Sequence, residues 1–378
     1  MPEPLLEARP LVDELVGTQP PAWDVAGELP IELLRKLGAL GLLCAQVPER
    51  FGGPGASSAD NGEFTAHVGA LCSSLRSIMT SQGIAATTVQ RFGDREQRSR
   101  YLAELTGGRL AAVGFSEPGA GSDLSAMTTR VEPDGDEVVL NGRKMWVTGS
   151  KYADYLVIYA RYGQDGAAVM VPSDAPGVRI EPVANPMGCR AASHCNLFFD
   201  QVRLPASSVL GGGGQALSLL FTSALSYGRV SVAWGCVGIL RACLGAATAH
   251  AAEREQAGRP LTDHQLVLRH LAELLAAERA ATALCERASR DWDGSSPEMA
   301  VSAVLAKHVS ATGAARGAAS AVQVLASAGA EDGHVVARAY RDAKMMEIIE
   351  GTNEISQLIL AQHALAAHQR PSAPLATH

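Results

Sequence analysis

The sequence has no two cysteines separated by only two residues, and its seven cysteines are odd in number. Disulfide frameworks and structural zinc sites need paired or closely spaced cysteines, so this pattern argues against both. We therefore expect no metal site. Free cysteine is among the residue types most often found inside proteins, and we expect all seven to be buried thiols.

The chain also has no surplus of positive charge and no sign of an export or membrane segment. Its 32 Lys and Arg against 39 Asp and Glu give a net charge of −7, which offers no attractive field for nucleic acid. Residues 1–16 contain acidic residues and Pro10 but no basic stretch followed by an apolar core, which argues against a secretory signal. No apolar run approaches the roughly 18 residues that would span a bilayer. We expect a soluble protein of the cytoplasm.

The 378 residues do contain three regions of different texture, enough for two or three domains. Residues 1–109 repeat apolar residues at three- and four-residue spacing, which predicts an α-helical domain. Residues 110–210 alternate β-forming segments with turn signals, which predicts a β-barrel or sandwich. Residues 211–368 are rich in Ala and Leu, which predicts a helical bundle whose small side chains also favour self-association. Residues 369–378 read as a disordered tail.

The same patterns place the individual elements. Helices are expected at 11–16, 31–43, 61–75, 79–92, 94–105, 216–254, 263–292, 297–327 and 337–368. Strands are expected at 137–140, 144–148, 155–161, 168–171, 178–183 and 196–202, with a turn at Asn141 and Gly142 between the first two.

Two distant segments together indicate a flavin site with a carboxylate base. Residues 348–354 read IIEGTNE and set Glu350 beside isoleucines, where poor solvation would raise its pKa toward the range needed to take a C–H proton. Residues 116–123 read SEPGAGSD, in which glycines allow close approach of an anion and Ser116 and Ser122 add hydroxyl donors. A carboxylate at a helix end in water is the ordinary alternative for Glu350.

The order of helical, β and helical regions, with these motifs at the joints, resembles the acyl-CoA dehydrogenase family of flavoproteins over essentially the whole chain. The resemblance implies an α+β multidomain fold with an N-terminal helical domain, a middle β-barrel or sandwich and a C-terminal four-helix bundle. It also implies FAD as the cofactor and oxidation of an acyl thioester. Glu350 stands at the position of the family's catalytic base, and Arg229 matches an arginine that faces this base and either keeps it ionised or binds an acidic group of the substrate.

Four segments carry the cofactor part of the resemblance. Residues 113–123 (VGFSEPGAGSD), 144–148 (KMWVT), 254–265 (REQAGRPLTDHQ) and 323–329 (QVLASAG) are similar to family motifs. Trp146 would pack on the flavin ring and Thr148 would bond near its N5, although a tryptophan of the β core is the ordinary alternative. Arg254 would bind the FAD pyrophosphate of an adjoining subunit. The implied FAD-binding residues are Phe115, Ser116, Gly121, Ser122, Trp146, Val147, Thr148, Arg254, Gln256, Gln265, Gln323, Ser327, Thr352 and Asn353.

Three departures from the family motifs bear on the cofactor. Ala257 stands where phenylalanine is usual, which predicts weaker apolar cover for FAD. Ala326 and Ser327 stand where the family has glycines, which predicts altered backbone contacts to the cofactor. The segment at 340–344 (YRDAK) matches a family segment that is mostly architectural.

Thr80, Ser81 and Gln82 lie where members of the family line the acyl pocket, and their polar side chains argue against a long hydrocarbon substrate. The residues expected at the acyl group are these three together with Ser122, Arg229 and Gly351. Ser226 stands where coenzyme A dehydrogenases often have an aspartate. Four strings, at 61–69, 72–77, 232–243 and 346–351, resemble the subgroup that acts in methoxymalonyl extender-unit synthesis in polyketide clusters such as that for ascomycin. This subgroup is thought to oxidise a glycerate-derived unit on acyl carrier protein to hydroxymalonyl-ACP, and Arg229 and Arg190 are candidates for binding the new carboxylate.

The resemblance leaves other functions and the partners open. A conventional short-chain acyl-CoA dehydrogenase, a carrier-binding member of the fold without turnover, and an oxygenase are alternatives, although Glu350 argues against the oxygenase. Acyl carrier protein is the expected partner, and a basic patch for it would draw on Arg179, Arg190, Arg203 and Arg269. A homodimer or homotetramer and an electron acceptor such as an electron-transfer flavoprotein are further expectations.

Overall fold

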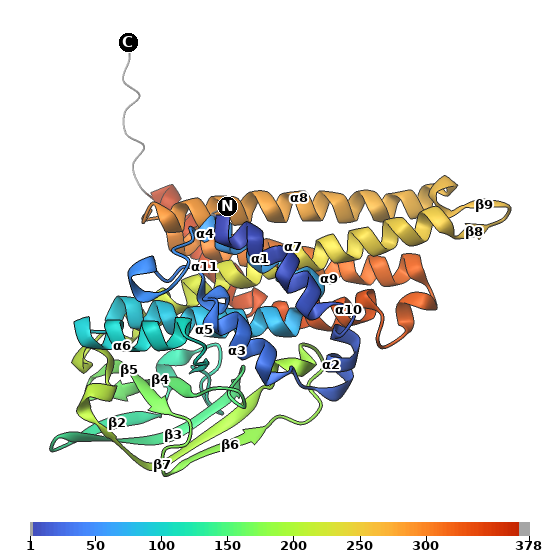
Figure 1. Ribbon diagram of the computed structural model, residues 1–378. Coiled ribbons are helices and arrows are strands. Elements are labelled where there is room, and N and C mark those ends of the chain that lie inside the picture. Colours follow the sequence, from blue (N-terminus) through green and yellow to red (C-terminus); the bar gives the residue numbers. More distant parts are fainter. Residues whose placement is uncertain (1–2, 370–378) are drawn as a thin grey trace.

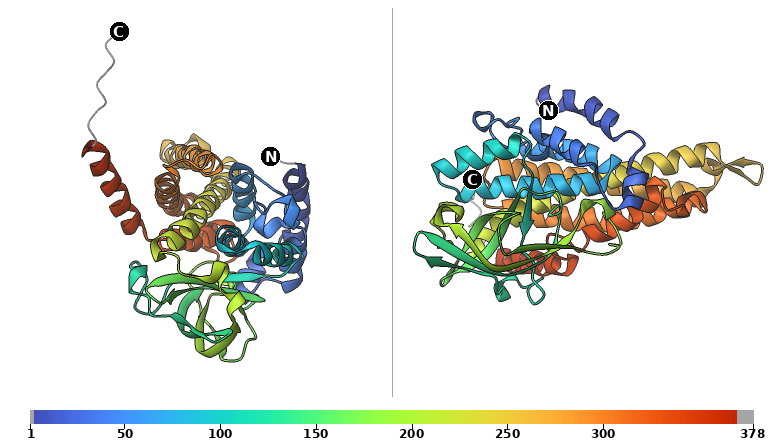
Figure 2. Two further views of the ribbon diagram at one scale, coloured as in Figure 1. Left: turned by 90° about the vertical axis from the view of Figure 1, so that its left-hand side faces the viewer. Right: turned by 60° about the horizontal axis from the view of Figure 1, so that its bottom comes forward.

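The computed structural model of the protein describes residues 3–369 and has three packed regions (Figure 1). Helices α1–α6 come first, a sheet of strands β1–β7 follows, and helices α7–α11 complete the chain. The sheet lies against α5 and α6, and the long C-terminal helices cover the other side of α5 (Figures 1 and 2). The predicted tail lies outside the described residues except for Gln369, which ends α11.

The N-terminal region is helical, as the sequence predicts, with different bounds. Its helices are α1 (Glu3–Val16), α2 (Pro20–Ala26), α3 (Ile31–Ala39), α4 (Ser58–Leu71), α5 (Ser73–Phe92) and α6 (Arg95–Thr106). The predicted helix at 61–75 is wrong at its end, because Cys72 is extended (φ −155°, ψ 107°) and separates α4 from α5. The short helix α2 was not predicted, because seven residues are too few to show the helical repeat of apolar residues.

The middle region is a β half-barrel. Its strands are β1 (Ala111–Gly114), β2 (Arg130–Asp134), β3 (Glu137–Val147), β4 (Tyr155–Tyr162), β5 (Asp165–Pro172), β6 (Val178–Pro182) and β7 (Cys195–Pro205). They run in the order β1-β4-β2-β3-β7-β6, and β5 pairs with β4. The predicted turn at Asn141 and Gly142 is wrong: β3 continues through it with a register shift, and the positive φ of Gly142 (146°) accommodates the irregularity.

The C-terminal region is a bundle built on the long helix α7. It comprises α7 (Leu217–Glu253), α8 (Gln265–Asp293), α9 (Met299–Leu325), α10 (Val335–Met346) and α11 (Asn353–Gln369), with the small strands β8 (Glu255–Gln256) and β9 (Arg259–Pro260) at the α7–α8 turn. Buried alanines dominate its core, and Trp234 of α7 lies against Gly62 of α4. The predicted single helix at 337–368 is wrong, because the chain breaks between α10 and α11. In Figure 2, α11 diverges from the other helices of the bundle.

Helix α7 is the one helix among residues 3–369 that is long and apolar enough to cross a membrane, with a mean hydropathy of 1.6 in its most apolar window. The expectation that no segment reaches this length is therefore corrected. Of that window, 72% is buried inside the fold, which is the environment of a core helix.

Helix α9 ends in a conformation that suits glycine. Ala326 has φ 52° and ψ −127°, a region that side chains with a Cβ rarely adopt. The backbone therefore keeps a glycine-like path at one of the positions where the sequence departs from the family motif.

We expect Ala326→Gly to raise the free energy of unfolding by about 1 kcal/mol, because the strain it relieves exceeds the entropy that glycine adds to the unfolded chain. The control is Ala103→Gly, on the exposed face of α6, where an ordinary helical alanine is lost and stability should fall by about 1 kcal/mol. Urea unfolding of both variants checks the pair, and a fall for both would contradict the expected strain.

Candidate active site

The break between α10 and α11 holds the candidate base in a strained conformation. Glu350 has φ 55°, which is left-handed and uncommon for a residue with a side chain. Buried cations bind the carbonyl oxygens of this turn. Lys307 Nζ donates to the carbonyls of Glu347 (3.3 Å) and Gly351 (2.7 Å), and Arg229 Nε donates to that of Glu350 (3.1 Å). The carbonyls freed by the break are thus bound by side chains from α9 and α7.

The two residues after Gly351 close the turn and begin α11. Asn353 is buried, and its Nδ2 donates to Thr312 Oγ1 and to Glu347 Oε1, each at 3.1 Å. Its Oδ1 has no partner, and Thr352 is half-buried beside it. The side-chain amide of Asn353 is therefore occupied in holding the turn.

The carboxylate of Glu350 lies against the backbone of α7. Its Oε2 is buried without a hydrogen-bond partner, although the residue as a whole is partly exposed. A Cβ on Gly228 would come within 2.1 Å of that oxygen, so only glycine leaves room for it. Burial raises the pKa of Glu350 to about 7, while the charges of Arg229, Lys307 and Arg76 oppose the shift. A carboxyl with this pKa can accept a proton near neutral pH.

The SEPGAGSD loop is fixed by a buried ion pair at its start and is open at its tip. Glu117 Oε1 accepts from Lys144 Nζ at 2.8 Å, with both side chains buried. Burial opposes ionisation of Glu117, yet its bonds to Lys144 and Thr129 lower its pKa to about 2. At the tip, Gly121 and Ser122 are exposed, and a Cβ on Gly121 would meet nothing within 4 Å.

The other two loop residues expected at the cofactor are half-buried at its base. Phe115 packs its ring against Tyr159, with 4.5 Å between ring centroids. The carbonyl of Ser116 accepts from Met145 N at 2.8 Å, which ties the loop to β3. The structure therefore fixes where the exposed tip stands relative to the end of β3.

The end of β3 presents an aromatic side chain outward. Trp146 has φ 57° and is 47% exposed, so the alternative of a tryptophan in the β core is wrong. Val147 is buried in that core. Thr148 Oγ1 lies 3.2 Å from Nδ1 of His194, a buried residue that the sequence analysis missed and that no motif singles out. Nε2 of His194 has no partner, and burial lowers its pKa to about 4, so it is neutral at pH 7.

Helix α5 brings two of its three predicted substrate residues toward this region. Ser81 Oγ donates to the Thr148 carbonyl at 3.2 Å, and Thr80 Oγ1 lies 2.7 Å from Ser231 Oγ on α7. Gln82 differs. Its amide donates to the carbonyls of Leu105 and Arg109 and accepts from Ala111 N at 2.7 Å, which gives it a bracing role between α5, α6 and β1 rather than one at the substrate.

The remaining cofactor candidates lie elsewhere on the chain. Arg254, Gln256 and Gln265 are exposed around the β8–β9 turn, at the tip of the hairpin that projects from the body in Figure 1. Gln323 and Ser327 are exposed at the end of α9. A single chain therefore does not bring the hairpin residues to Trp146 and Glu350.

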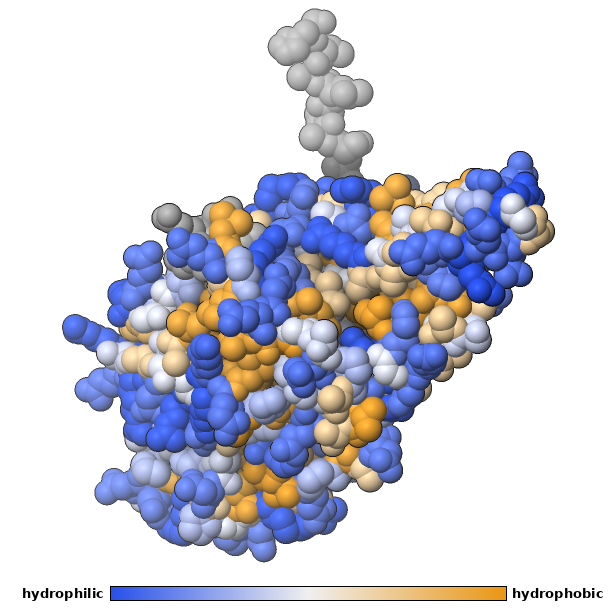
Figure 3. All heavy atoms as spheres, turned by 45° about the vertical axis from the view of Figure 1, so that its right-hand side comes forward, coloured by the Kyte–Doolittle hydropathy of each residue, from blue (hydrophilic) through white to orange (hydrophobic). Residues whose placement is uncertain are grey.

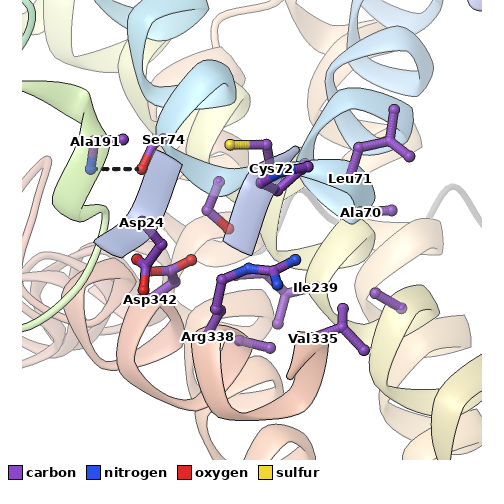
Figure 4. A pocket seen from close by; sticks show the side chains of 15 residues that line it. Asp24, Ala70, Leu71, Cys72, Ser74, Ala191, Ile239, Val335, Arg338 and Asp342 are labelled. Carbon is purple, nitrogen blue, oxygen red and sulfur yellow. Dashed lines mark hydrogen bonds between the residues drawn. The ribbon is translucent and has the colours of Figure 1, made fainter. Parts of the chain in front are cut away.

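A separate small hollow lies between α4, α5, α7 and α10 (Figure 4). Asp24 and Asp342 meet at one end, and burial raises the pKa of Asp342. Asp342 Oδ1 accepts from Cys189 N at 2.6 Å, and Ser74 Oγ accepts from Ala191 N at 3.2 Å. These bonds hold the loop that leads to His194, so the YRDAK segment is architectural here.

The residues present fit a flavin nucleotide. An exposed aromatic ring, a hydroxyl close to it in the chain and a glycine-rich loop with free space at its tip occur at the end of β3. A buried carboxylate oxygen without a hydrogen-bond partner lies near α5 and α7. Models of the acyl-CoA dehydrogenase N-terminal, middle and C-terminal domains match residues 6–109, 112–202 and 219–365. The chain belongs to the acyl-CoA dehydrogenase family. It is accordingly an FAD-dependent oxidoreductase that acts on acyl thioesters.

Relatives and solved structures agree with this assignment. The chain is 34% identical to the probable acyl-CoA dehydrogenase YngJ of Bacillus subtilis, over 90% of this chain and 92% of YngJ. FkbI, for biosynthesis of the methoxymalonyl extender unit of the FK520 polyketide immunosuppressant, is 60% identical with a TM-score of 0.91, over 95% of this chain and 99% of FkbI. A glutaryl-CoA dehydrogenase from Mycobacterium smegmatis, solved in complex with FADH2, is 27% identical with a TM-score of 0.91, over 96% and 94% of the two chains.

We expect Gly228→Ala to lower the rate of flavin reduction by acyl thioester by about 100-fold or more, because the new methyl group displaces the carboxylate of Glu350. Gly245→Ala is the matched control on the same helix, where a Cβ meets nothing within 4 Å, and it should keep the rate. Stopped-flow absorbance of FAD-loaded protein measures both. Equal rates for the two variants would contradict the placement of Glu350.

Proposed function

We propose that this enzyme oxidises a small polar acyl thioester on acyl carrier protein, 2-hydroxy-3-oxopropionyl-ACP, to hydroxymalonyl-ACP for methoxymalonyl extender-unit synthesis. The similarity to FkbI over nearly the whole length of both chains carries the proposal. Polar groups of α5 and α7 in the region of the base, among them the Thr80–Ser231 pair, support it, because such groups suit a polar acyl chain better than a long hydrocarbon.

The chain's residues supply proton transfer and positioning for this reaction. Glu350 takes the α-proton, and its raised pKa suits that role near neutral pH. FAD, when bound, accepts the β-hydride. If the β-carbon is an aldehyde hydrate, losing both hydrogens gives the enol of a carboxylic acid, which regains a proton at the α-carbon as hydroxymalonyl thioester. Ser116, Ser122, Trp146 and Thr148 would hold the flavin, with Thr148 oriented by His194.

We also propose that the chain self-associates, which the position of the hairpin residues supports. Arg254 and Gln256 reach an FAD bound at Trp146 only in another copy of the chain, because their own hairpin points away from the body. Exposed leucines on the adjoining helix, Leu266, Leu268 and Leu275, support contact between copies. In Figure 3, hydrophobic side chains gather on the face beside the hairpin, whose tip is hydrophilic.

We propose acyl carrier protein as the partner that bears the substrate, and the cytoplasm as the place of the reaction. The arginines expected to dock an acidic carrier all have acidic neighbours. Arg179 pairs with Glu181, Arg190 with Asp24 and Asp332, Arg203 with Asp134 and Glu137, and Arg269 with Glu273. A carrier would therefore compete with these pairs. The same pairing makes Arg190 a poor ligand for a substrate carboxylate. An electron-transfer flavoprotein is the acceptor we propose.

The decisive experiment mixes FAD-loaded protein anaerobically with 2-hydroxy-3-oxopropionyl-ACP and separately with butyryl-CoA, and follows loss of the visible flavin band. We expect the ACP substrate to reduce the flavin and Glu350→Gln to slow this by about 100-fold or more. Glu331→Gln, an exposed carboxylate, should react normally. Reduction by butyryl-CoA alone would assign conventional short-chain oxidation, and reduction by neither would contradict the proposal.

We expect the second-order rate constant for this reduction to rise with pH and to level off above about pH 7. The reason is that Glu350 must be deprotonated to act as a base and its pKa is about 7. Below that value the rate constant should fall about tenfold per pH unit. A profile that is flat between about pH 5.5 and 8 would show that another group takes the proton.

A further inference from the structure

Arg76 of α5 is a buried cation that forms no ion pair within the described residues. It is 1% exposed, and no carboxylate among residues 3–369 forms an ion pair with it. Nη1 donates to Thr80 Oγ1 at 3.2 Å and Nη2 to Met346 Sδ at 2.9 Å. A hydroxyl and a thioether are weak partners for a guanidinium whose planar donors match a carboxylate.

Several other charged side chains in the interior of the fold have stronger partners. Lys144 pairs with Glu117 at 2.8 Å, and Arg341 pairs with Asp24 and Asp332. Lys307 binds two carbonyl oxygens. A buried charge is costly unless it is paired, so the isolation of Arg76 calls for a ligand that the chain itself does not provide.

The position of Arg76 brings that ligand into the active-site region. Its guanidinium lies against α7, since a Cβ on Gly235 would come within 2.7 Å of Nε. Met346, which it touches, is the last residue of α10 and precedes the turn that carries Glu350. Its positive charge acts to lower the pKa of Glu350 and that of His194, the partner of Thr148. Thr80 and Ser231 add two hydroxyls at the same place.

We propose that Arg76, assisted by Thr80 and Ser231, binds the terminal carboxylate of the acyl group. The substrate class is then a thioester whose β-carbon carries oxygens and becomes a carboxylate, as in a malonyl-type product. This inference deepens the proposed function and rests on it. Arg76 is thus the proposed ligand of the substrate carboxylate in place of Arg190 and Arg229. Arg190 is paired with acidic residues, and Nε of Arg229 binds the turn that carries Glu350.

Two thioesters of the same heavy-atom count test the proposal on FAD-loaded protein. Malonyl-pantetheine ends in a carboxylate and acetoacetyl-pantetheine in a neutral methyl ketone. Isothermal titration should show wild-type protein binding malonyl-pantetheine about tenfold or more tighter. Arg76→Met should remove that preference while changing acetoacetyl affinity by no more than about threefold. Arg100→Met, an exposed arginine of α6, should keep it. No preference in wild type, or equal losses of both ligands in Arg76→Met, would overturn the proposal.

Thermal unfolding adds a readout that a structural role would not give. If Arg76 serves binding, replacing an unpaired buried charge by methionine should leave the melting temperature of ligand-free protein equal or higher. A large fall would mean that Arg76 holds the fold and would count against the proposal. Thr80→Val then tests the site in a folded protein, with a selective loss of malonyl affinity expected and an unchanged preference overturning the inference.

The experiments distinguish failure of the Arg76 carboxylate site from failure of the proposed function. If 2-hydroxy-3-oxopropionyl-ACP reduces the flavin but the protein does not prefer malonyl-pantetheine, the carboxylate site at Arg76 is wrong and the proposed oxidation stands. If the preference for malonyl-pantetheine depends on Arg76 but that substrate does not reduce the flavin, the carboxylate site stands and the proposed substrate is wrong.

Discussion

The turn between α10 and α11 is the constraint on which the active-site geometry depends. Helices normally bond their own carbonyls, and a break inside the fold leaves several without partners. Here Lys307 and Arg229 bind the carbonyls of Glu347, Glu350 and Gly351, so two helices of the bundle hold the turn. Because these donors are buried cations, the turn that exposes the base to substrate is also surrounded by positive charge.

That surrounding charge explains why the base can still ionise. Burial by itself raises the pKa of Glu350, because it disfavours the charged carboxylate. Arg229, Lys307 and Arg76 each favour the carboxylate, and the balance leaves a pKa of about 7. The cations therefore do two things at once, since they fix the backbone of the turn and set the proton affinity of its side chain. A neutral hydrogen-bond donor at position 307 or 229 could hold the carbonyls but would not supply the charge.

Sequence motifs could identify Glu350, Trp146, Thr148 and the SEPGAGSD loop, because each is local and carries its own chemistry. They could not show that the helix breaks after Met346, because apolar residues recur at helical spacing on both sides of the break. The break is stabilised by side chains from other helices, and these contacts are not visible in the local sequence. Long-range pairings were missed for the same reason. Gln82 binds backbone groups at 105–111, and His194 meets Thr148 across 46 residues. Lys307, a basic residue in an Ala-rich helix, is a signal in the sequence that a buried cation could bind the turn of Glu350.

Several features that would destabilise an ordinary protein occur together around Glu350. Its own φ is 55°, its Oε2 is buried without a partner, and Arg76 and Lys307 are cations in the interior. Each is unfavourable alone, and strain or unpaired charge persists where function requires it. The core of the bundle beyond this region is apolar and alanine-rich, so its packing can offset these unfavourable free energies. Because the unfavourable features occur together, they indicate, independently of any motif, that the chemistry takes place between α5, α7 and the turn of Glu350.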